Sequence, residues 1–374
     1  MSKTPKNIIH IYSDPKFIYF IDSYRFHQFN NELVYIGDSD NIPLKFKKNA
    51  HLLAKDSANQ LNQLLEICKT ADLLIVNFLN KITVKLILSL PEKIKIIWRF
   101  YGAEIYTREP DLFYSKETLK YWKTKKKNTS VMHMIIRYFR PALLSYKNIK
   151  LLLSKIDFFL GVMEDEHTLL KNMGYDLPTF LQFPIGFIPY NQGNFKKSSL
   201  IIFGNSRNKD NNHLDVLKLF RNTMLPNELK IKMFFSYGIV DEYSHQVKKE
   251  SEQIPEIELI ETFLPKEEFI EIYHHAAALV INGYRQMALD NIVTALMNGV
   301  KIYLSEKNVT YSWATKNNFL VYSIENDLEK DLKCNNIFLS ASEKQNNFES
   351  LQILMREHSL EKFQNQIIRI VNSE

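Results

Sequence analysis

The sequence predicts an α/β protein of two domains, each built on a parallel sheet with crossover helices. Short apolar runs alternate with helical patterns along both halves of the chain, which is typical of such sheets. At 374 residues the chain is long enough for two separate cores. Turn-forming residues from Pro184 to Gly193 indicate a linker, so we place the domains at 1–190 and 191–374. The last helix is a candidate to pack back on the first domain.

The elements follow from these runs, each ended by turn-forming residues. In the first half we expect strands at 7–12, 33–36, 72–78, 94–98, 158–162 and 179–183, and helices at 17–29, 56–70, 81–90 and 164–173. In the second half we expect strands at 199–203, 230–235, 256–260, 278–281, 301–304 and 319–322, and helices that include 266–277, 288–298 and a final one from about 345. Residues 107–155 interrupt this alternation with a basic, aromatic cluster and a long helical stretch.

Composition restricts the class of protein. Apolar residues make up 45% of the chain and charged residues 24%, which is typical of a globular protein. The formal charge of +6 fits an anionic ligand or an anionic lipid surface, but does not single out nucleic acid. The only cysteines, Cys68 and Cys334, are far apart, which fits a reducing cytosol. No signal-peptide core or membrane-spanning run is evident, so we expect a cytoplasmic protein, soluble or peripheral on a membrane.

Two Rossmann-like domains joined by a Pro/Gly linker have the layout of a GT-B glycosyltransferase. In such a fold, ligands bind in a central cleft at the carboxyl ends of the strands. The run from Leu200 into Gly204, Asn205 and Ser206 leads to a helix that opens near Asn211 or Asn212. A strand, a glycine turn and a helix N-terminus with unpaired amide groups predict an anion site. An ordinary strand-to-helix turn is the alternative.

A second candidate for donor binding follows the strand at 278–281. Arg285 is placed to pair with phosphate oxygens, with Gln286 beside it. Common retaining GT-B enzymes carry two glutamates in this unit, whereas Gln286 and Thr294 occupy the matching positions here, so that family is disfavoured. Asp290, one helical turn before Thr294, is a candidate contact for the ribose. A surface arginine is the alternative interpretation of Arg285.

Three further positions complete the expected site. Tyr237 and Gly238 follow the strand at 230–235 and are expected beside the nucleotide, although a plain turn explains them equally well. Glu104 follows a tight bend at Gly102 and is the first candidate for the base that takes the acceptor proton. Asp14, before a proline, is the second candidate. Helix capping and turn chemistry are the respective alternatives.

Metal and membrane sites are weighed from short patterns. Asp38 and Asp40 imitate a metal-binding DxD motif but lie in a turn context. His274 and His275 are adjacent, so they do not share a helix face. We therefore expect no metal site. The basic, aromatic cluster around 121–127 is either a solvated face or a surface that docks on anionic lipid. Its candidate docking residues are Trp122, Lys125, Lys126 and Lys127.

Several stretches together resemble the TDP-N-acetylfucosamine:lipid II N-acetylfucosaminyltransferase family of enterobacterial common antigen synthesis. The residues that carry the resemblance are Trp98, Gly102, Ala103, Tyr106, Phe183, Pro184, Gly204, Asn205, Ser206, His213, Gly238, Arg285, Gln286, Gly299 and Trp313. The resemblance implies a GT-B fold, a nucleotide-sugar donor in the second domain, no metal requirement, and a polyprenyl-linked acceptor at the inner face of the cytoplasmic membrane. Glu104 stands where the family has Asp, and the segment after Gln286 lacks the family's glycines.

The sequence thus predicts an enzyme that transfers a deoxy-amino sugar from a nucleoside diphosphate, TDP by preference, to a polyprenyl-diphosphate-linked saccharide. No cofactor is expected, because the nucleotide sugar is a substrate. One alternative is another GT-B fucosyl- or glycosyltransferase of capsule or O-antigen synthesis. A second is a non-catalytic sugar-nucleotide-binding protein. Nucleic acid is not expected as a partner, because the basic residues cluster in one short region.

Overall fold

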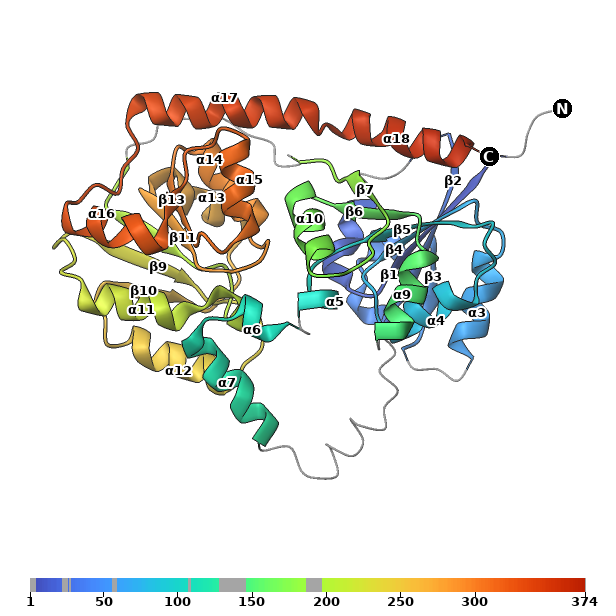
Figure 1. Ribbon diagram of the computed structural model, residues 1–374, viewed down its shortest axis with the longest axis horizontal. Coiled ribbons are helices and arrows are strands. Elements are labelled where there is room, and N and C mark those ends of the chain that lie inside the picture. The colour runs from blue at the N-terminus through green and yellow to red at the C-terminus, as the bar shows by residue number, and fades with distance from the viewer. Residues whose placement is uncertain are drawn as a thin grey trace. The chain divides into compact units, whose positions relative to one another are not determined.

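The computed structural model of the chain contains two compact units, each with a parallel sheet surrounded by helices (Figure 1). The described residues are 5–21, 26, 28–55, 59–106, 109–127, 146–185 and 197–373. Unit 1 takes its described residues from 1–104, 134–185 and 358–374, and unit 2 takes its residues from 105–133 and 186–357. The predicted α/β class is confirmed.

The sheet of unit 1 has seven parallel strands in the order β3-β2-β1-β4-β5-β6-β7. The strands are β1 (Asn7–Tyr12), β2 (Asn30–Ile36), β3 (Ala50–Leu53), β4 (Leu73–Asn77), β5 (Lys95–Arg99), β6 (Phe158–Gly161) and β7 (Thr179–Gln182). The central strands β1 and β4 are buried along their whole length, because helices cover both faces of a parallel sheet. The strand order reverses between β1 and β4, so the loops that follow these two strands diverge at the carboxyl ends of the strands.

Helices of unit 1 connect these strands. They are η1 (Pro15–Phe20), η2 (Ser39–Asn41), α2 (Leu44–Lys47), α3 (Gln60–Cys68), α4 (Lys81–Ser89), α9 (Tyr146–Ser154), α10 (Glu164–Asn172) and α18 (Leu360–Asn372), and α5 (Ala103–Tyr106) lies at the boundary of the units. Helix α18 belongs to this unit through its apolar stripe and its C-terminal carbonyls. Phe363 contacts the rings of Phe26 and Phe183, and Lys6 and Lys95 donate to the carbonyls of Val371 and Ile370. Cations at a helix C-terminus are favourable.

The sheet of unit 2 has six parallel strands in the order β10-β9-β8-β11-β12-β13. The strands are β8 (Leu200–Phe203), β9 (Lys230–Phe234), β10 (Ile257–Ile260), β11 (Ala278–Ile281), β12 (Lys301–Leu304) and β13 (Tyr322–Ser323). Counted within the unit this is the Rossmann order 3-2-1-4-5-6. The switch point lies between β8 and β11, both completely buried, so the loops after these strands are the expected ligand loops.

Helices of unit 2 include a segment from the first half of the chain. They are α6 (Pro110–Phe113), α7 (Lys116–Lys127), η3 (Lys209–Asn211), α11 (His213–Asn222), α12 (Glu242–Ser251), α13 (Lys266–His275), α14 (Leu289–Met297), α15 (Val309–Lys316), η4 (Ile324–Leu328), α16 (Glu329–Lys333) and α17 (Ala341–Glu357). The ring of Tyr121 on α7 lies edge-on to Tyr243 on α12. The amide of Ser115 donates to Asn212 Oδ1 at 2.9 Å. Residues 109–121 thus pack against helices of unit 2.

The structure differs from the expected elements in four places. Strand β3 is missed because only one of its residues is buried, as is common on a sheet edge. The expected helix at 17–29 starts as the 3-10 helix η1, and residues 22–25 and 27 lie outside the described residues. The strand expected at 319–322 is β13, because the amide of Phe319 instead closes α15 by donating to Ala314 O. The single final helix is two helices, since Ser359 caps α18.

Candidate functional site

The two loops at the switch point of unit 2 are joined by a reciprocal pair of hydrogen bonds. Asn212 Nδ2 donates to the carbonyl of Asn282 at 3.1 Å, and Asn282 Nδ2 donates to the carbonyl of Asn212 at 3.0 Å. Both side chains are buried. Asn212 has a φ of 45°, a left-handed conformation that asparagine tolerates better than most residues. The loop after β8 and the loop after β11 are therefore held in a fixed relationship.

An ion pair joins the same two loops. Arg285 Nη2 lies 2.7 Å from Asp210 Oδ2, and Arg285 Nη1 donates to the carbonyl of Gln286 at 3.0 Å. The Arg285 side chain is only 15% exposed, and its guanidinium carbon lies 5.5 Å from the centre of the Tyr106 ring. The sequence predicts that Arg285 pairs with phosphate oxygens. In this structure a carboxylate occupies one edge of the guanidinium, and a phosphate at that edge has to compete with it.

The glycine turn after β8 is held in shape by the side-chain amide of Asn211, which belongs to the same loop. Gly204 has a φ of 66°, and Asn211 Oδ1 accepts the amide hydrogen of Asn205 at 3.2 Å. Asn211 Nδ2 donates to both Ser206 Oγ and Ser206 O at 3.1 Å, so the buried Ser206 hydroxyl shapes the loop. Asn205 Nδ2 donates to Tyr237 Oη at 3.1 Å. Asn205 Oδ1 is buried and has no partner among the described residues, which leaves it available to a ligand donor.

Gly238 allows the loop after β9 to approach the loop after β8. It has a φ of 115°, and a Cβ atom there would lie 2.5 Å from Asn208 Oδ1. That oxygen accepts the amide hydrogen of Ile239 at 3.1 Å. Neighbouring Tyr237 is 47% exposed. Partial burial raises the pKa of its phenol, while the Asp290 carboxylate adds to the rise and the Arg285 charge opposes it. The structure therefore gathers most of the predicted donor residues around Tyr237.

The N-terminus of α11 differs from the anion site that the sequence predicts. The first amide of the helix, at His213, donates to Tyr243 Oη at 2.8 Å. Asp215 lies in the first turn, where burial raises the pKa of its carboxyl. Burial also lowers the pKa of the fully enclosed His213 to about 3, so this ring is neutral. A helix end with an occupied amide and a buried carboxylate is poorly suited to an anion.

Helix α14 begins differently. Ala288, the residue before it, has a φ of 56°, and no side chain caps the helix. Asp290 is exposed on the first turn, and Gln286 is half-buried in the loop before it. Thr294 is buried and its hydroxyl donates to Asp290 O at 2.7 Å, so Thr294 serves the helix itself. Among the predicted positions of this helix, Asp290 is the one whose side chain faces solvent.

Glu104 is buried in unit 1, unlike an exposed or merely capping glutamate. Trp98 Nε1 donates to Glu104 Oε1 at 3.3 Å, and the amide of Tyr101 donates to Oε2 at 3.4 Å. These bonds are long, and burial outweighs them, raising the pKa of Glu104 to about 7. A carboxyl with this pKa is suited to exchange a proton near neutral pH.

Asp14 shares an electrostatic environment with Glu104. Tyr101 connects them. Burial raises its phenolic pKa, the charge and hydrogen bond of Arg99 oppose the rise, and the charges of Glu104 and Asp14 add to it. The rings of Tyr101 and Phe17 are stacked with centres 3.9 Å apart, and Tyr101 Oη donates to Asn77 Oδ1 at 3.4 Å. The sequence analysis missed Tyr101 and Asn77. For Asn77, the available signal in the sequence was a polar residue at the end of an apolar strand.

The metal and membrane candidates take ordinary or undescribed positions. Asp38 accepts the amide hydrogen of Asp40 in a turn, and no group of three or more His, Cys, Asp or Glu in the described part of the chain could hold a metal ion. Trp122, Lys125, Lys126 and Lys127 fall in α7, where the description covers the backbone but not these side chains. None of the helices in the described ranges combines the length and apolar character of a membrane span.

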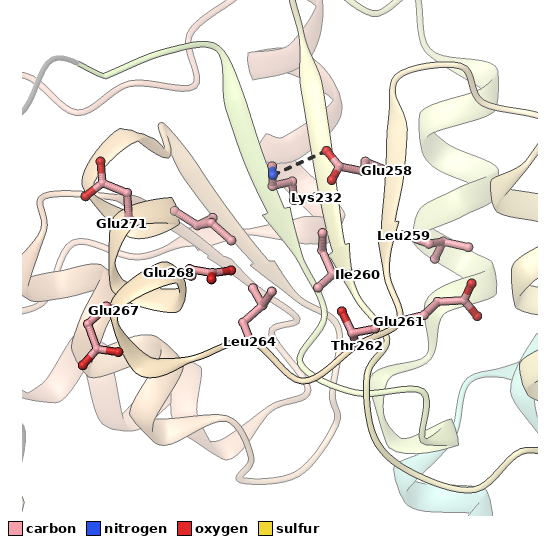
Figure 2. A pocket seen from close by; sticks show the side chains of 11 residues that line it. Lys232, Glu258, Leu259, Ile260, Glu261, Thr262, Leu264, Glu267, Glu268 and Glu271 are labelled. Carbon is pink, nitrogen blue, oxygen red and sulfur yellow. Dashed lines mark ion pairs between the residues drawn. The ribbon is translucent and has the colours of Figure 1, made fainter.

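A groove on the edge of unit 2 has the wrong charge for a nucleotide. Figure 2 shows it beside β10, with glutamates projecting around an open space. The volume of this groove is about 840 Å³. Five glutamates line it, namely Glu258, Glu261, Glu267, Glu268 and Glu271. Lys232 lies 3.4 Å from Glu258 and offsets part of that charge. Because a diphosphate is repelled by such a lining, the loops after β8 and β11 remain the candidate donor site.

Solved structures match the chain over nearly its whole length. An Anabaena protein, HepE, in complex with UDP and glucose is 9% identical, with 99% of this chain and 100% of that chain covered and a TM-score of 0.63. A glycosyltransferase from Rickettsia africae is 10% identical, with 99% and 100% covered and a TM-score of 0.60. An α-glucosyltransferase in complex with UDP and DNA is 11% identical, with the same coverage and a TM-score of 0.54.

No family model matches the sequence, and no curated protein matches it either. Identities of 9–11% show a shared fold and leave substrate and activity to be argued from the site. The two Rossmann-like sheets and these likenesses confirm the predicted fold class. The chain adopts the α/β fold of the GT-B glycosyltransferases.

Proposed function

We propose that the protein is a glycosyltransferase that takes its sugar from a nucleoside diphosphate bound by unit 2. The observation that carries this proposal is the junction of the loops after β8 and β11 by Asn212 and Asn282 at the switch point. Rossmann-like domains bind nucleotides at this place. The proposal is supported by neighbours of the same fold that were solved with UDP.

In this proposal the donor is held by the loops already described. Gly204 and Gly238 let the ligand approach the backbone, and Asn205 Oδ1 accepts a ligand donor. Arg285 pairs with the diphosphate, assisted by the uncapped first turn of α14. Gln286, Tyr237 and Asp290 lie around this point, and Asp290 is the candidate contact for a ribose hydroxyl. Ser206 and Thr294 act through the shape of the loop and helix.

Glu104 is the proposed general base for the acceptor hydroxyl. In the transfer, the acceptor oxygen forms a bond to the anomeric carbon, the bond from that carbon to the diphosphate oxygen breaks, and the hydroxyl proton passes to the base. A carboxyl with a pKa of about 7 can accept this proton at neutral pH. Asp14 is the second candidate. The leaving nucleoside diphosphate keeps the electron pair of the broken bond.

The finer assignment rests on the resemblance to the N-acetylfucosaminyltransferase family. It gives a deoxy-amino sugar on TDP as donor and a polyprenyl-diphosphate-linked saccharide as acceptor, with no metal ion. It also places the protein at the inner face of the cytoplasmic membrane, where Trp122 and the lysines at 125–127 are the proposed docking residues. Another surface polysaccharide pathway is the alternative for the sugar and the acceptor.

A thermal-shift screen against TDP, UDP, GDP and CDP tests the donor class. A ligand at 100 times its dissociation constant stabilises the folded protein by about 2.7 kcal/mol, which raises the unfolding midpoint. A selective shift with TDP supports the finer assignment, and one with UDP or GDP retains the function but changes the pathway. No shift with any of them refutes a nucleotide-sugar site. Binding without transfer or donor hydrolysis indicates the non-catalytic alternative.

A further inference from the structure

Two polar side chains end neighbouring strands of unit 1 with unmet hydrogen-bond donors. Asn77 is the last residue of β4 and Arg99 is the last residue of β5, and the two are register partners in the sheet. They are 2% and 6% exposed. Within the described residues, Asn77 Nδ2 and Arg99 Nε are buried and have no acceptor. Most buried polar atoms in proteins have a partner, so two unmet donors on adjacent strand ends need an explanation.

The charge of Arg99 is also uncompensated. Arg99 Nη1 donates to the carbonyl of Leu160 at 3.1 Å, and the guanidinium carbon lies 3.8 Å from the centre of the Phe183 ring. The guanidinium also hydrogen-bonds the Tyr101 phenol, whose ring centre lies 5.1 Å from the guanidinium carbon. These contacts orient the guanidinium but supply no negative charge. Glu104 accepts from Trp98 and from the Tyr101 amide, and no ion pair to Arg99 occurs in the described part of the chain. A buried cation without an anion is costly to the folded state.

The backbone beside these residues is strained. Phe78, directly after Asn77, has a φ of 80°, and its amide donates to the carbonyl of Arg99 at 3.4 Å. A positive φ on a bulky residue is unfavourable and tends to occur at ligand sites. Strand β4 borders the switch point of this sheet. Ligands of α/β proteins bind beside the carboxyl ends of the strands at such a point.

We propose that Asn77 and Arg99 form an oxyanion subsite, which receives the phosphate or carboxylate carried by the glycosyl acceptor. Arg99 Nε presents one donor, carried by a guanidinium whose positive charge attracts a carboxylate or phosphate. Asn77 Nδ2 supplies a second donor. The claim that the bound anion belongs to the glycosyl acceptor rests on the proposed function. The claim that Asn77 and Arg99 bind an anion does not.

Anion binding to the full chain tests the subsite. The unfolding midpoint is measured with sodium pyrophosphate or sodium glucuronate at constant ionic strength. One or both should raise the midpoint of the wild type. Arg99→Met should weaken that response by about tenfold or more in concentration, because a charge-assisted hydrogen bond is lost. Without anion its midpoint should equal or exceed that of the wild type, since an unpaired buried charge is replaced by an apolar chain.

Two further variants make the test specific. Lys95→Met removes one positive charge from the opposite end of the same strand and should keep the anion response. Asn77→Asp places a carboxylate beside Arg99 as an internal substitute for the ligand. It should raise the midpoint and abolish the response to either anion. A response to pyrophosphate alone identifies a phosphate source, and one to glucuronate alone identifies a sugar carboxylate.

Several results overturn the proposal. The first is that the wild type responds to neither anion. The second is that Arg99→Met responds to the anions as the wild type does. The third is that Arg99→Met without anion is less stable than the wild type. A loss of the UDP response in Arg99→Met overturns the assignment to the acceptor, because the subsite then serves the donor. A protein that binds these anions through Arg99 but binds no nucleotide refutes the proposed function and leaves the subsite intact.

Discussion

Asn212 and Asn282 each donate a side-chain amide to the other's backbone carbonyl, at 3.1 and 3.0 Å, across 70 residues of sequence. Asn212 also accepts the amide hydrogen of Ser115, so a third segment is fixed at the same point. The shape of the candidate donor site depends on this pair, because the flanking strands β8 and β11 end where these loops begin.

Asn282→Ala should therefore lower both stability and donor affinity. The substitution leaves a buried carbonyl at Asn212 without its donor, which costs about 1–3 kcal/mol of unfolding free energy. The loops after β8 and β11 lose one of their connections, so the nucleotide response should also weaken. Urea unfolding and nucleotide titration measure the two effects. Asn347→Ala, which removes the bonds of this buried side chain to the backbone of Leu320 elsewhere in unit 2, is the control and should spare nucleotide binding.

Arg285→Ala should weaken nucleoside diphosphate binding by about 1.5–3 kcal/mol, the value of a charge-assisted hydrogen bond. Asp210→Asn tests the competing ion pair. It frees the guanidinium from a carboxylate 2.7 Å away and should leave affinity unchanged or increased. Calorimetric titration of both variants measures the change. Unaltered affinity in Arg285→Ala would show that the ion pair with Asp210 is purely structural.

The pKa of Glu104 predicts a dependence of stability on pH. Burial raises it from 4.5 to about 7, so the folded protein binds this proton more tightly than the unfolded chain does. The resulting stabilisation is complete below pH 4.5 and is lost as the pH rises through 7, a change of about 3 kcal/mol. Glu104→Gln should remove this loss. The free energy of unfolding of the variant should therefore rise relative to that of the wild type as the pH increases from 4.5 to about 7.

The same variant separates binding from chemistry. Transfer by the wild type should rise as the pH passes through about 7, because Glu104 loses its proton there and becomes a base. Glu104→Gln should lose transfer and retain nucleotide affinity. A variant with wild-type activity would exclude Glu104 as the base and leave Asp14 to be tested by Asp14→Asn.

Asp331 should be essential to the stability of unit 2 and irrelevant to its ligand. Its carboxylate lies 2.8 Å from Lys301 Nζ and accepts from Tyr303 Oη at 2.7 Å, while the Lys301 side chain is 2% exposed. Asp331→Ala leaves a buried, unpaired ammonium and should cost about 3–5 kcal/mol. Denaturant unfolding measures the cost. At a temperature where the variant remains folded, its nucleotide affinity should equal that of the wild type.

The diphosphate is expected to leave without help from a metal ion. In the proposed function, Arg285 and the first turn of α14, which the side chain of Ala288 does not cap, take the place of a metal ion beside the diphosphate. Transfer should persist in excess EDTA, as measured by nucleoside diphosphate release. Activity that disappears in EDTA and returns with Mg²⁺ or Mn²⁺ would contradict this expectation.

Sequence reasoning recovered the buried strands because their signal is local. Strands β8 and β11 are uninterrupted apolar runs, and the loops after them supplied Gly204, Asn205 and Arg285. The partners of those residues could not be predicted, since Asn212 and Asn282 are ordinary asparagines until the fold brings them together. Asn77 and Arg99 were missed for the same reason: each is unusual because of burial, which only tertiary structure imposes.

The last helix, α18, belongs to the unit whose strands come first in the chain. During synthesis on the ribosome, the strands of unit 1 emerge before unit 2, but Phe363, Ile367 and Val371 emerge only after it. Until then Lys6 and Lys95 lack the carbonyls to which they donate, and apolar surface on unit 1 stays exposed. All the residues of unit 2 are therefore made before α18, whereas unit 1 is completed only once α18 has been added.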